Sequence, residues 1–236
     1  MTSLDLTENV NHIRRSLESA ALERWGRAPE IIAVSKTVPA ERVNQLKACG
    51  LYALGENRVQ EILEKLPNLD ARFKVDMIGR LQNNKVKYII DKVAMIQSLD
   101  RMSLAQEIDK RAKQHGLKMP VLIQINIGRE PQKGGLPEEE LLPFAKEING
   151  LDGLELRGIM AVMPDTGDEE VLRPLFVRMR TMYEHLQAEG LSGTRIDELS
   201  MGMSGDYLLA AQEGATHVRL GSAVFGTRAK KNSNLG

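Results

Sequence analysis

Apolar positions along the chain follow two alternating patterns. Short runs of mostly β-branched apolar residues, such as Ile31–Val34 and Pro120–Ile127, are typical of strands buried on both faces. Between these runs, segments such as Leu6–Trp25 and Glu169–Glu189 carry apolar residues every three or four positions, which is the periodicity of amphipathic helices. Strands and helices that alternate in this way form right-handed βαβ units around a parallel sheet.

The pattern predicts eight strands separated by helices. The expected strands are Ile31–Lys36, Leu51–Leu54, Phe73–Ile78, Ala94–Gln97, Pro120–Ile127, Leu154–Ala161, Ile196–Ser200 and Thr216–Leu220. The expected helices after the first are Pro39–Cys49, Asn57–Leu66, one through Val86–Ile90, Asp100–His115, one from Pro137, Glu169–Glu189 and Ser204–Glu213, with a short last helix or turn from Ala223. We expect Thr7 to cap the first helix and Asp100 to cap the one that it opens.

Eight such units in 236 residues favour a single closed (β/α)8 barrel of the TIM type over an open doubly wound sheet. Leu6–Trp25 is then an extra N-terminal helix in front of the barrel. No linker or low-complexity segment divides the chain. We therefore expect residues 1–228 to form one α/β barrel domain and residues 229–236 to form a frayed C-terminal tail.

Composition excludes several classes of protein. The 32 basic residues are balanced by 32 acidic ones, whereas a nucleic-acid-binding surface needs a clustered basic excess. No apolar stretch approaches the roughly 18 residues that span a bilayer, and the N-terminus lacks the order of a signal peptide. Cys49 is the single cysteine, and the four histidines lack metal-ligand spacing. We expect a cytoplasmic protein that binds neither nucleic acid, nor membrane, nor metal.

Lys36 is the first candidate for chemistry, because it interrupts a core-facing row at the end of a strand. Period-two alternation places Ile32, Val34 and Lys36 on one face. The carboxyl ends of barrel strands carry the functional residues, and partial desolvation there favours the neutral amine that forms imines. The structural alternative is a lysine at the rim of the sheet that extends its charge into solvent.

The last two strands end in glycine–serine turns, Ser200–Ser204 and Gly221–Ser222. Glycine and serine let backbone N–H groups and hydroxyls approach an anion, and barrels often bind phosphate after their seventh and eighth strands. Arg219 alternates with His217 on one face of the eighth strand. A guanidinium inside a barrel needs a partner, either a carboxylate such as Glu198 or a ligand acceptor such as a heteroaromatic nitrogen.

An imine-forming lysine, a phosphate cradle and an arginine together describe a pocket for pyridoxal 5′-phosphate (PLP). Five motifs in order along the chain resemble those of the pyridoxal phosphate homeostasis protein family. They are Ala33–Thr37, Gly55–Glu61, Ile78–Lys85, Leu199–Ser204 and Val218–Gly221. Two departures stand out: Arg58 where the family commonly has an aromatic residue, and Asp76–Met77 where it has a His–Phe pair.

The resemblance implies a barrel similar to the N-terminal domain of alanine racemase, with PLP held covalently on Lys36 as an internal aldimine. It also implies that Arg219 lies at the pyridine nitrogen and Asn57 beside the ring. The phosphate would be surrounded by Ser200, Gly221 and Ser222, and the backbone near Met201 would lie beside the ring.

Arginine at the pyridine nitrogen disfavours ring protonation and weakens the cofactor as an electron sink. Racemisation also needs groups on both faces of the substrate, and alanine racemase supplies its second group, a tyrosine, from a C-terminal domain that we expect to be absent here. We therefore expect a non-catalytic protein that binds PLP and takes part in intracellular PLP homeostasis. We expect it to be a monomer or weak dimer, with PLP-dependent apo-enzymes as candidate partners. The alternatives are a weak PLP-dependent amino-acid racemase or lyase, and an aldolase-like barrel that acts on a sugar phosphate through Lys36.

Overall fold

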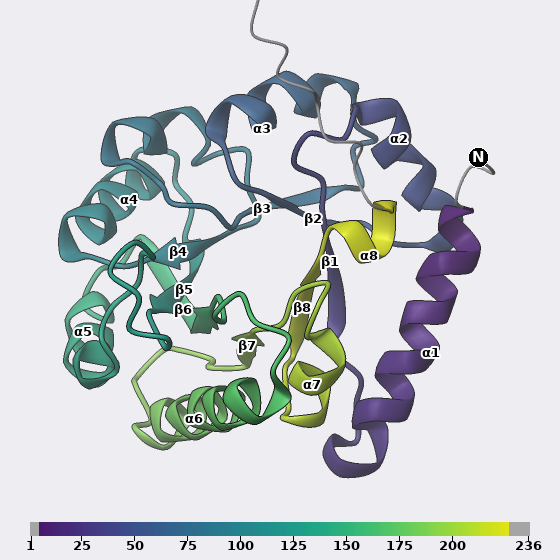
Figure 1. Cartoon of the computed structure of the whole chain (residues 1–236). Coiled ribbons are helices and arrows are strands. Elements are labelled where there is room, and N and C mark those ends of the chain that lie inside the picture. Colours follow the sequence, from purple (N-terminus) through teal and green to yellow (C-terminus); the bar gives the residue numbers. More distant parts are fainter. Residues whose placement is uncertain (1–4, 227–236) are drawn as a thin grey trace, which may run out of the picture.

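Eight parallel strands close into a barrel, and each strand pairs with its neighbours in chain order (Figure 1). The computed structural model describes residues 5–226, so the predicted tail at 229–236 lies outside the described residues. The strands are β1 (Glu30–Val34), β2 (Ala53–Glu56), β3 (Lys74–Met77), β4 (Met95–Leu99), β5 (Met119–Ile125), β6 (Leu154–Ala161), β7 (Glu198–Ser200) and β8 (His217–Leu220). The predicted single (β/α)8 barrel is confirmed.

Helices surround the barrel on the outside (Figure 1). The α-helices are α1 (Leu6–Trp25), α2 (Ala40–Asn44), α3 (Val59–Lys65), α4 (Met102–Gln114), α5 (Leu141–Ile148), α6 (Glu169–Ala188), α7 (Tyr207–Gln212) and α8 (Ser222–Phe225). Short 3-10 helices complete the ring as η1 (Gln45–Cys49), η2 (Leu66–Asn68), η3 (Asn83–Tyr88) and η4 (Glu138–Glu140). The segment between β3 and β4, predicted as an α-helix, is therefore a single 3-10 helix, η3.

Two predicted helix caps are wrong. Asp5 caps α1, because its Oδ1 accepts hydrogen bonds from the backbone N–H groups of Thr7 (2.8 Å) and Glu8 (3.2 Å). Thr7 lies inside the first turn. The N-cap residue of α4 is Arg101, one residue after Asp100, and the Asp100 carboxylate forms an ion pair with the Arg101 side chain instead of capping the helix.

The extra helix α1 covers the side of the barrel where β8 meets β1. The element after β8 is only four residues long, and α1 lies beside it and beside α7 (Figure 1). Trp25 Nε1 donates to the carbonyl of Gln212 in α7 (2.9 Å), and Asn9 Nδ2 donates to the carbonyl of Ala223 in α8 (2.5 Å). The chain thus covers the seam between β8 and β1 with its own N-terminal segment.

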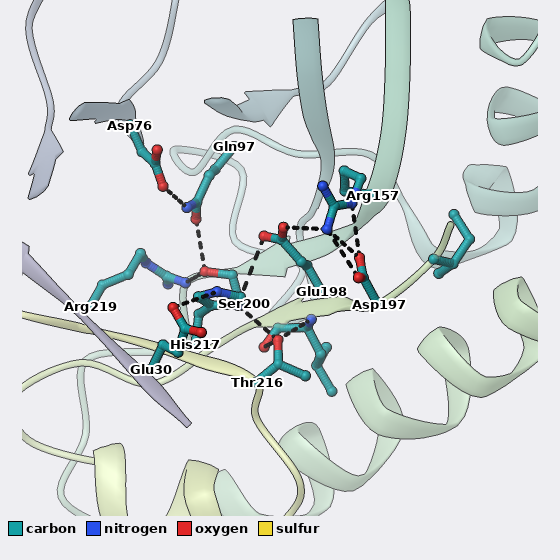
Figure 2. Close-up of polar contacts among 12 residues, drawn as sticks. Glu30, Asp76, Gln97, Arg157, Asp197, Glu198, Ser200, Thr216, His217 and Arg219 are labelled. Carbon is teal, nitrogen blue, oxygen red and sulfur yellow. Dashed lines mark hydrogen bonds and ion pairs between the residues drawn. The ribbon is translucent and has the colours of Figure 1, made fainter. Parts of the chain in front are cut away.

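Strand side chains alternate between the outer core and the barrel interior, as period-two geometry requires. In β8, Val218 and Leu220 join the large core beneath the helices, whereas Arg219 points inward. The barrel interior has an apolar part and a polar part. One part is an apolar cluster of Met95, Leu122 and Met160, and the other carries the polar network of Figure 2.

Gly158 in β6 makes the packing against β7 possible. Its φ of 155° is rare for other residues, and an added Cβ would lie 1.7 Å from the carbonyl oxygen of Glu198. We expect Gly158→Ala to lower the free energy of unfolding by about 3 kcal/mol or more, through strain and a backbone clash. Urea denaturation measures the loss. Gly167→Ala, where an added Cβ meets nothing within 4 Å, is the matched control, and equal losses in both variants would contradict this account.

Candidate functional site

A cavity of about 670 Å³ opens at the carboxyl ends of the strands, where barrels carry their sites. Its volume lies in the usual range for small-molecule pockets, on the order of 300–1,000 Å³. It is called the Lys36 cavity below. Its lining consists of Val34, Lys36, Asn57, Ile78, Val162, Met203, Ser204, Gly205, Arg219, Gly221 and Ser222.

Five of the seven predicted site residues line this cavity. They are Lys36, Asn57, Arg219, Gly221 and Ser222. Ser200 and Met201 do not line it, and both are fully buried. The prediction missed Ser204, which belongs to the same glycine–serine turn as Ser200, and it missed the apolar wall formed by Val34, Ile78, Val162 and Met203.

The backbone around Lys36 is held in place on both sides. Lys65 Nζ donates to the carbonyl of Ser35 (2.6 Å) and to Glu56 Oε1 (2.6 Å), and Ser35 Oγ donates to the same carboxylate oxygen (2.6 Å). The next residue, Thr37, has a φ of 62°, which is rare for a β-branched residue. Its N–H donates to Glu61 Oε2 at 2.7 Å.

The Lys36 side chain itself has no hydrogen bond or ion pair with any residue from 5 to 226. It is partly buried and lines the cavity two residues beyond the end of β1. A fixed backbone with an unpartnered amine is an arrangement suited to a nucleophile, because no internal contact has to break before the amine can react.

Arg219 is a buried cation inside the barrel, with 4% of its surface exposed. Its guanidinium donates to Ser200 Oγ (2.7 Å) and to the carbonyl of Ala161 (2.6 Å), and among the described residues it forms no ion pair with a carboxylate. Burial lowers the pKa of Arg219 to about 10, a shift partly opposed by Asp206, so the group remains charged at neutral pH.

The expected structural alternative, an ion pair of Arg219 with Glu198, is wrong. Glu198 faces the other side of the network, where its carboxylate lies 3.3 Å from Arg157 and 3.8 Å from His217 Nδ1 (Figure 2). Burial raises the pKa of Glu198 to about 7 despite the nearby Arg157.

A chain of hydrogen bonds connects Arg219 to Asp76 across the barrel interior (Figure 2). Arg219 donates to Ser200 Oγ, and Ser200 Oγ donates to Gln97 Oε1 at 2.8 Å. Gln97 Nε2 then donates to Asp76 Oδ2 at 2.7 Å. The hydrogen bonds in this chain all run in one direction, from Arg219 toward Asp76. The Ser200 hydroxyl both accepts from Arg219 and donates to Gln97, so its proton is not available to a ligand.

Ser204, and not Ser200, contributes its side chain to the cavity wall. Its Oγ accepts hydrogen bonds from the backbone N–H groups of Gly221 and Ala223, both at 3.1 Å, and thereby joins the turns that follow β7 and β8. Gly202 makes this turn possible, because its φ is 93° and an added Cβ would lie 2.5 Å from the Cβ of Ala210.

Asn57 is held by the loop that follows β3. An added Cβ at Gly79 would lie 2.3 Å from the carbonyl oxygen of Asn57, so only glycine permits this approach of the two loops. The contact fixes the position from which Asn57 lines the cavity. It also explains why glycine follows Ile78, another lining residue, in this motif.

The fold and the cavity define a class of protein, the alanine racemase N-terminal-domain barrel. Residues 5–229 match the family model of this domain. Alanine racemase from Clostridium difficile superposes with a TM-score of 0.75 at 20% identity, covering 97% of this chain and 58% of that chain. That likeness establishes the barrel fold alone.

Closer relatives identify the family. The pyridoxal phosphate homeostasis protein of Aquifex aeolicus is 40% identical over 229 residues, which is 95% of this chain and 99% of the relative. The Escherichia coli protein of the same name is 34% identical, covering 95% and 97%. The structure of PipY from Synechococcus elongatus with PLP bound has a TM-score of 0.82 at 31% identity, covering 94% and 100%. This chain belongs to the pyridoxal phosphate homeostasis protein family.

Asp76 should make stability depend on pH. Burial is the main cause that raises its pKa to about 7. Between about pH 4 and pH 7 the folded protein therefore keeps a proton that the unfolded chain, with an ordinary Asp pKa of about 4, has already lost, so stability falls as the pH rises through this range and levels off above it. Asp76→Asn stays neutral and can still accept the bond from Gln97. We expect the wild type to lose about 2–3 kcal/mol of unfolding free energy relative to Asp76→Asn between pH 5 and pH 8, most of it below pH 7.

Urea denaturation of both proteins across this pH range measures the difference. Glu198 and His217 are present in both proteins, so the difference between the two curves reports Asp76 and its electrostatic coupling to Glu198. A difference that stays constant with pH would contradict the raised pKa of Asp76.

Proposed function

We propose that the protein binds PLP reversibly in the Lys36 cavity, as an imine with the Lys36 amine, and acts as a non-catalytic carrier in intracellular PLP homeostasis. The observation that carries the proposal is the presence, in one cavity of about 670 Å³, of a lysine amine without a partner and a buried arginine without a carboxylate partner among residues 5–226. The names of the relatives and the PLP-bound structure of PipY support it.

The residues of the cavity fit this cofactor group by group. PLP supplies an aldehyde when bound, and Lys36 offers the amine that can form an imine with it. Arg219 offers a permanent cationic donor to the ring nitrogen, and Asn57 borders the ring. Ser204 and Ser222 offer hydroxyl donors to the phosphate, and Ser222 also offers its backbone N–H. Gly221 lines the same cavity, and its own N–H donates to Ser204 Oγ. We assign the role at the phosphate to Ser204 instead of Ser200, whose hydroxyl is buried and already donates to Gln97.

A carrier role is favoured because the cavity contains one base only. Lys36 and Arg219 are its only ionisable lining residues within the described chain, and none of Tyr52, Tyr88, Tyr183 and Tyr207 lines it. Racemisation needs an acid and a base on opposite faces of the substrate carbon. The permanent charge of Arg219 also keeps a proton off the ring nitrogen, which disfavours the electron withdrawal that PLP enzymes use.

The same proposal extends to partners and location. A cavity open at one end of the barrel allows release of the cofactor, so PLP-dependent apo-enzymes are the proposed recipients, in the cytoplasm, with the carrier acting as a monomer or weak dimer. Within residues 5–226, no helix is long and apolar enough to cross a membrane.

Lys36→Ala tests the covalent link. After incubation with PLP and reduction with borohydride, we expect the wild type to carry one pyridoxyl group on the peptide that contains Lys36, and Lys36→Ala to lose both this adduct and the visible absorbance band. Peptide mass mapping and an absorbance spectrum measure the two effects. Lys118→Ala, which changes an exposed lysine at the opposite end of the barrel, should keep both.

A wild-type protein that remains colourless and unmodified in excess PLP would refute the proposal. Turnover of D- or L-amino acids above the Lys36→Ala background would instead favour the weak racemase or lyase.

Arg219→Glu tests the ring-nitrogen role. A carboxyl group in place of the guanidinium favours a protonated ring nitrogen, so we expect the absorbance band of the bound cofactor, or its pH dependence, to shift. Ser200→Ala is the matched comparison, since it removes one acceptor of Arg219 but keeps the charge, and a smaller shift is expected. An unchanged spectrum in Arg219→Glu would exclude contact between Arg219 and the ring.

A further inference from the structure

A second cavity, of about 830 Å³, lies next to the Lys36 cavity at the carboxyl ends of β2 and β3. It is called the Arg80 cavity below. Asn57 lines both cavities, so they meet at one side chain. The lining of the Arg80 cavity includes four cationic side chains, Arg58, Arg80, Lys85 and Arg101, and no carboxylate.

Three of these four cations have no anionic partner. Arg58 and Arg80 form no hydrogen bond or ion pair with any described residue, and Lys85 makes only a contact with the ring of Tyr88 at 5.7 Å. In a chain with no net charge, three uncompensated positive charges on one concave surface are a strong local excess. Their mutual repulsion falls when an anion binds between them.

The fourth cation, Arg101, holds the wall of the Arg80 cavity in place through hydrogen bonds. Arg101 is neutralised by Asp100 at 2.5 Å, and its guanidinium donates to the carbonyl of Leu81 and to Asn83 Oδ1, both at 2.7 Å. Asn83 Nδ2 in turn donates to the carbonyl of Ser103 at 3.0 Å. These bonds hold the loop after β3 in one position, so the wall that carries Arg80 and Gln82 is formed before any ligand arrives.

We propose that the Arg80 cavity is a second binding site of this protein, for a small phosphate ester with two or more negative charges. Guanidinium groups match phosphate oxygens with paired hydrogen bonds, and the side-chain amides of Gln60, Gln82 and Asn84 add neutral donors to the cavity lining. The volume is that of a small-molecule site, whereas an acidic protein surface would need a broad area of about 800 Å² on each partner.

This site does not depend on PLP binding, because the unpartnered cations and the arranged loop lie outside the Lys36 cavity. A phosphate ester here would lie beside Asn57, at the edge of the first cavity. The protein would then hold two ligands side by side at the same end of the barrel.

Isothermal titration with inorganic pyrophosphate tests the proposal on the full-length protein. We expect binding to the wild type that weakens as salt is raised, and about a tenfold or greater loss of affinity in Arg58→Gln/Arg80→Gln, which removes two charge-assisted contacts. Both arginines are exposed and without described contacts, so this double variant keeps the fold.

Two comparisons make the result specific. Lys110→Gln/Lys118→Gln removes the same charge from exposed lysines outside the cavity and should bind like the wild type, whereas an equal loss would show unspecific attraction and overturn the proposal. Ser204→Ala changes the first cavity only and should leave this binding intact. Absence of pyrophosphate binding to the wild type, or a loss in Ser204→Ala without a loss in Arg58→Gln/Arg80→Gln, would also overturn it.

Discussion

The parallel pairing of β8 with β1 is the constraint on which the rest of the structure depends. Lys36 and Arg219 come from opposite ends of the chain, and an open sheet would leave them on opposite edges. Closure of the barrel pairs Ile32 with Arg219 in register. Because side chains alternate along a strand, the row of Ile32, Val34 and Lys36 then faces the same barrel interior as Arg219. The N-terminal helix α1 supports this seam from outside by its bonds to α7 and α8.

Burial of Arg219 then determines the chemistry of the interior. A guanidinium cannot lose its charge near neutral pH, and burial without a carboxylate partner costs folding free energy. The barrel limits that cost with a directed hydrogen-bond chain through Ser200 and Gln97 to Asp76. Filling the barrel interior does not by itself require a buried arginine, because Met95, Leu122 and Met160 fill the other part of the interior with apolar side chains. The buried cation is held by directed hydrogen bonds to Ser200 and to the carbonyl of Ala161.

The open end of the barrel combines precise placement with excess positive charge. Around Lys36, contacts with Glu56, Glu61 and Lys65 hold the backbone, and the amine has no partner in the described part of the chain. On the other side of Asn57, Arg58 and Arg80 also lack partners among the described residues. Within residues 5–226, both cavities thus present cations without a carboxylate partner on a backbone that hydrogen bonds hold in place.

The sequence by itself determined the eight strands, the barrel and the inward direction of Lys36 and Arg219, because periodicity is a local property that each strand carries in its own residues. It also indicated the helix α1 within its observed limits. Tertiary structure alone decided that Ser204 reaches the cavity while Ser200 serves Arg219, and that Glu198 pairs with Arg157. These outcomes depend on the path of a glycine turn and on distances across the barrel, which join residues far apart in the chain and leave no periodic signal in it.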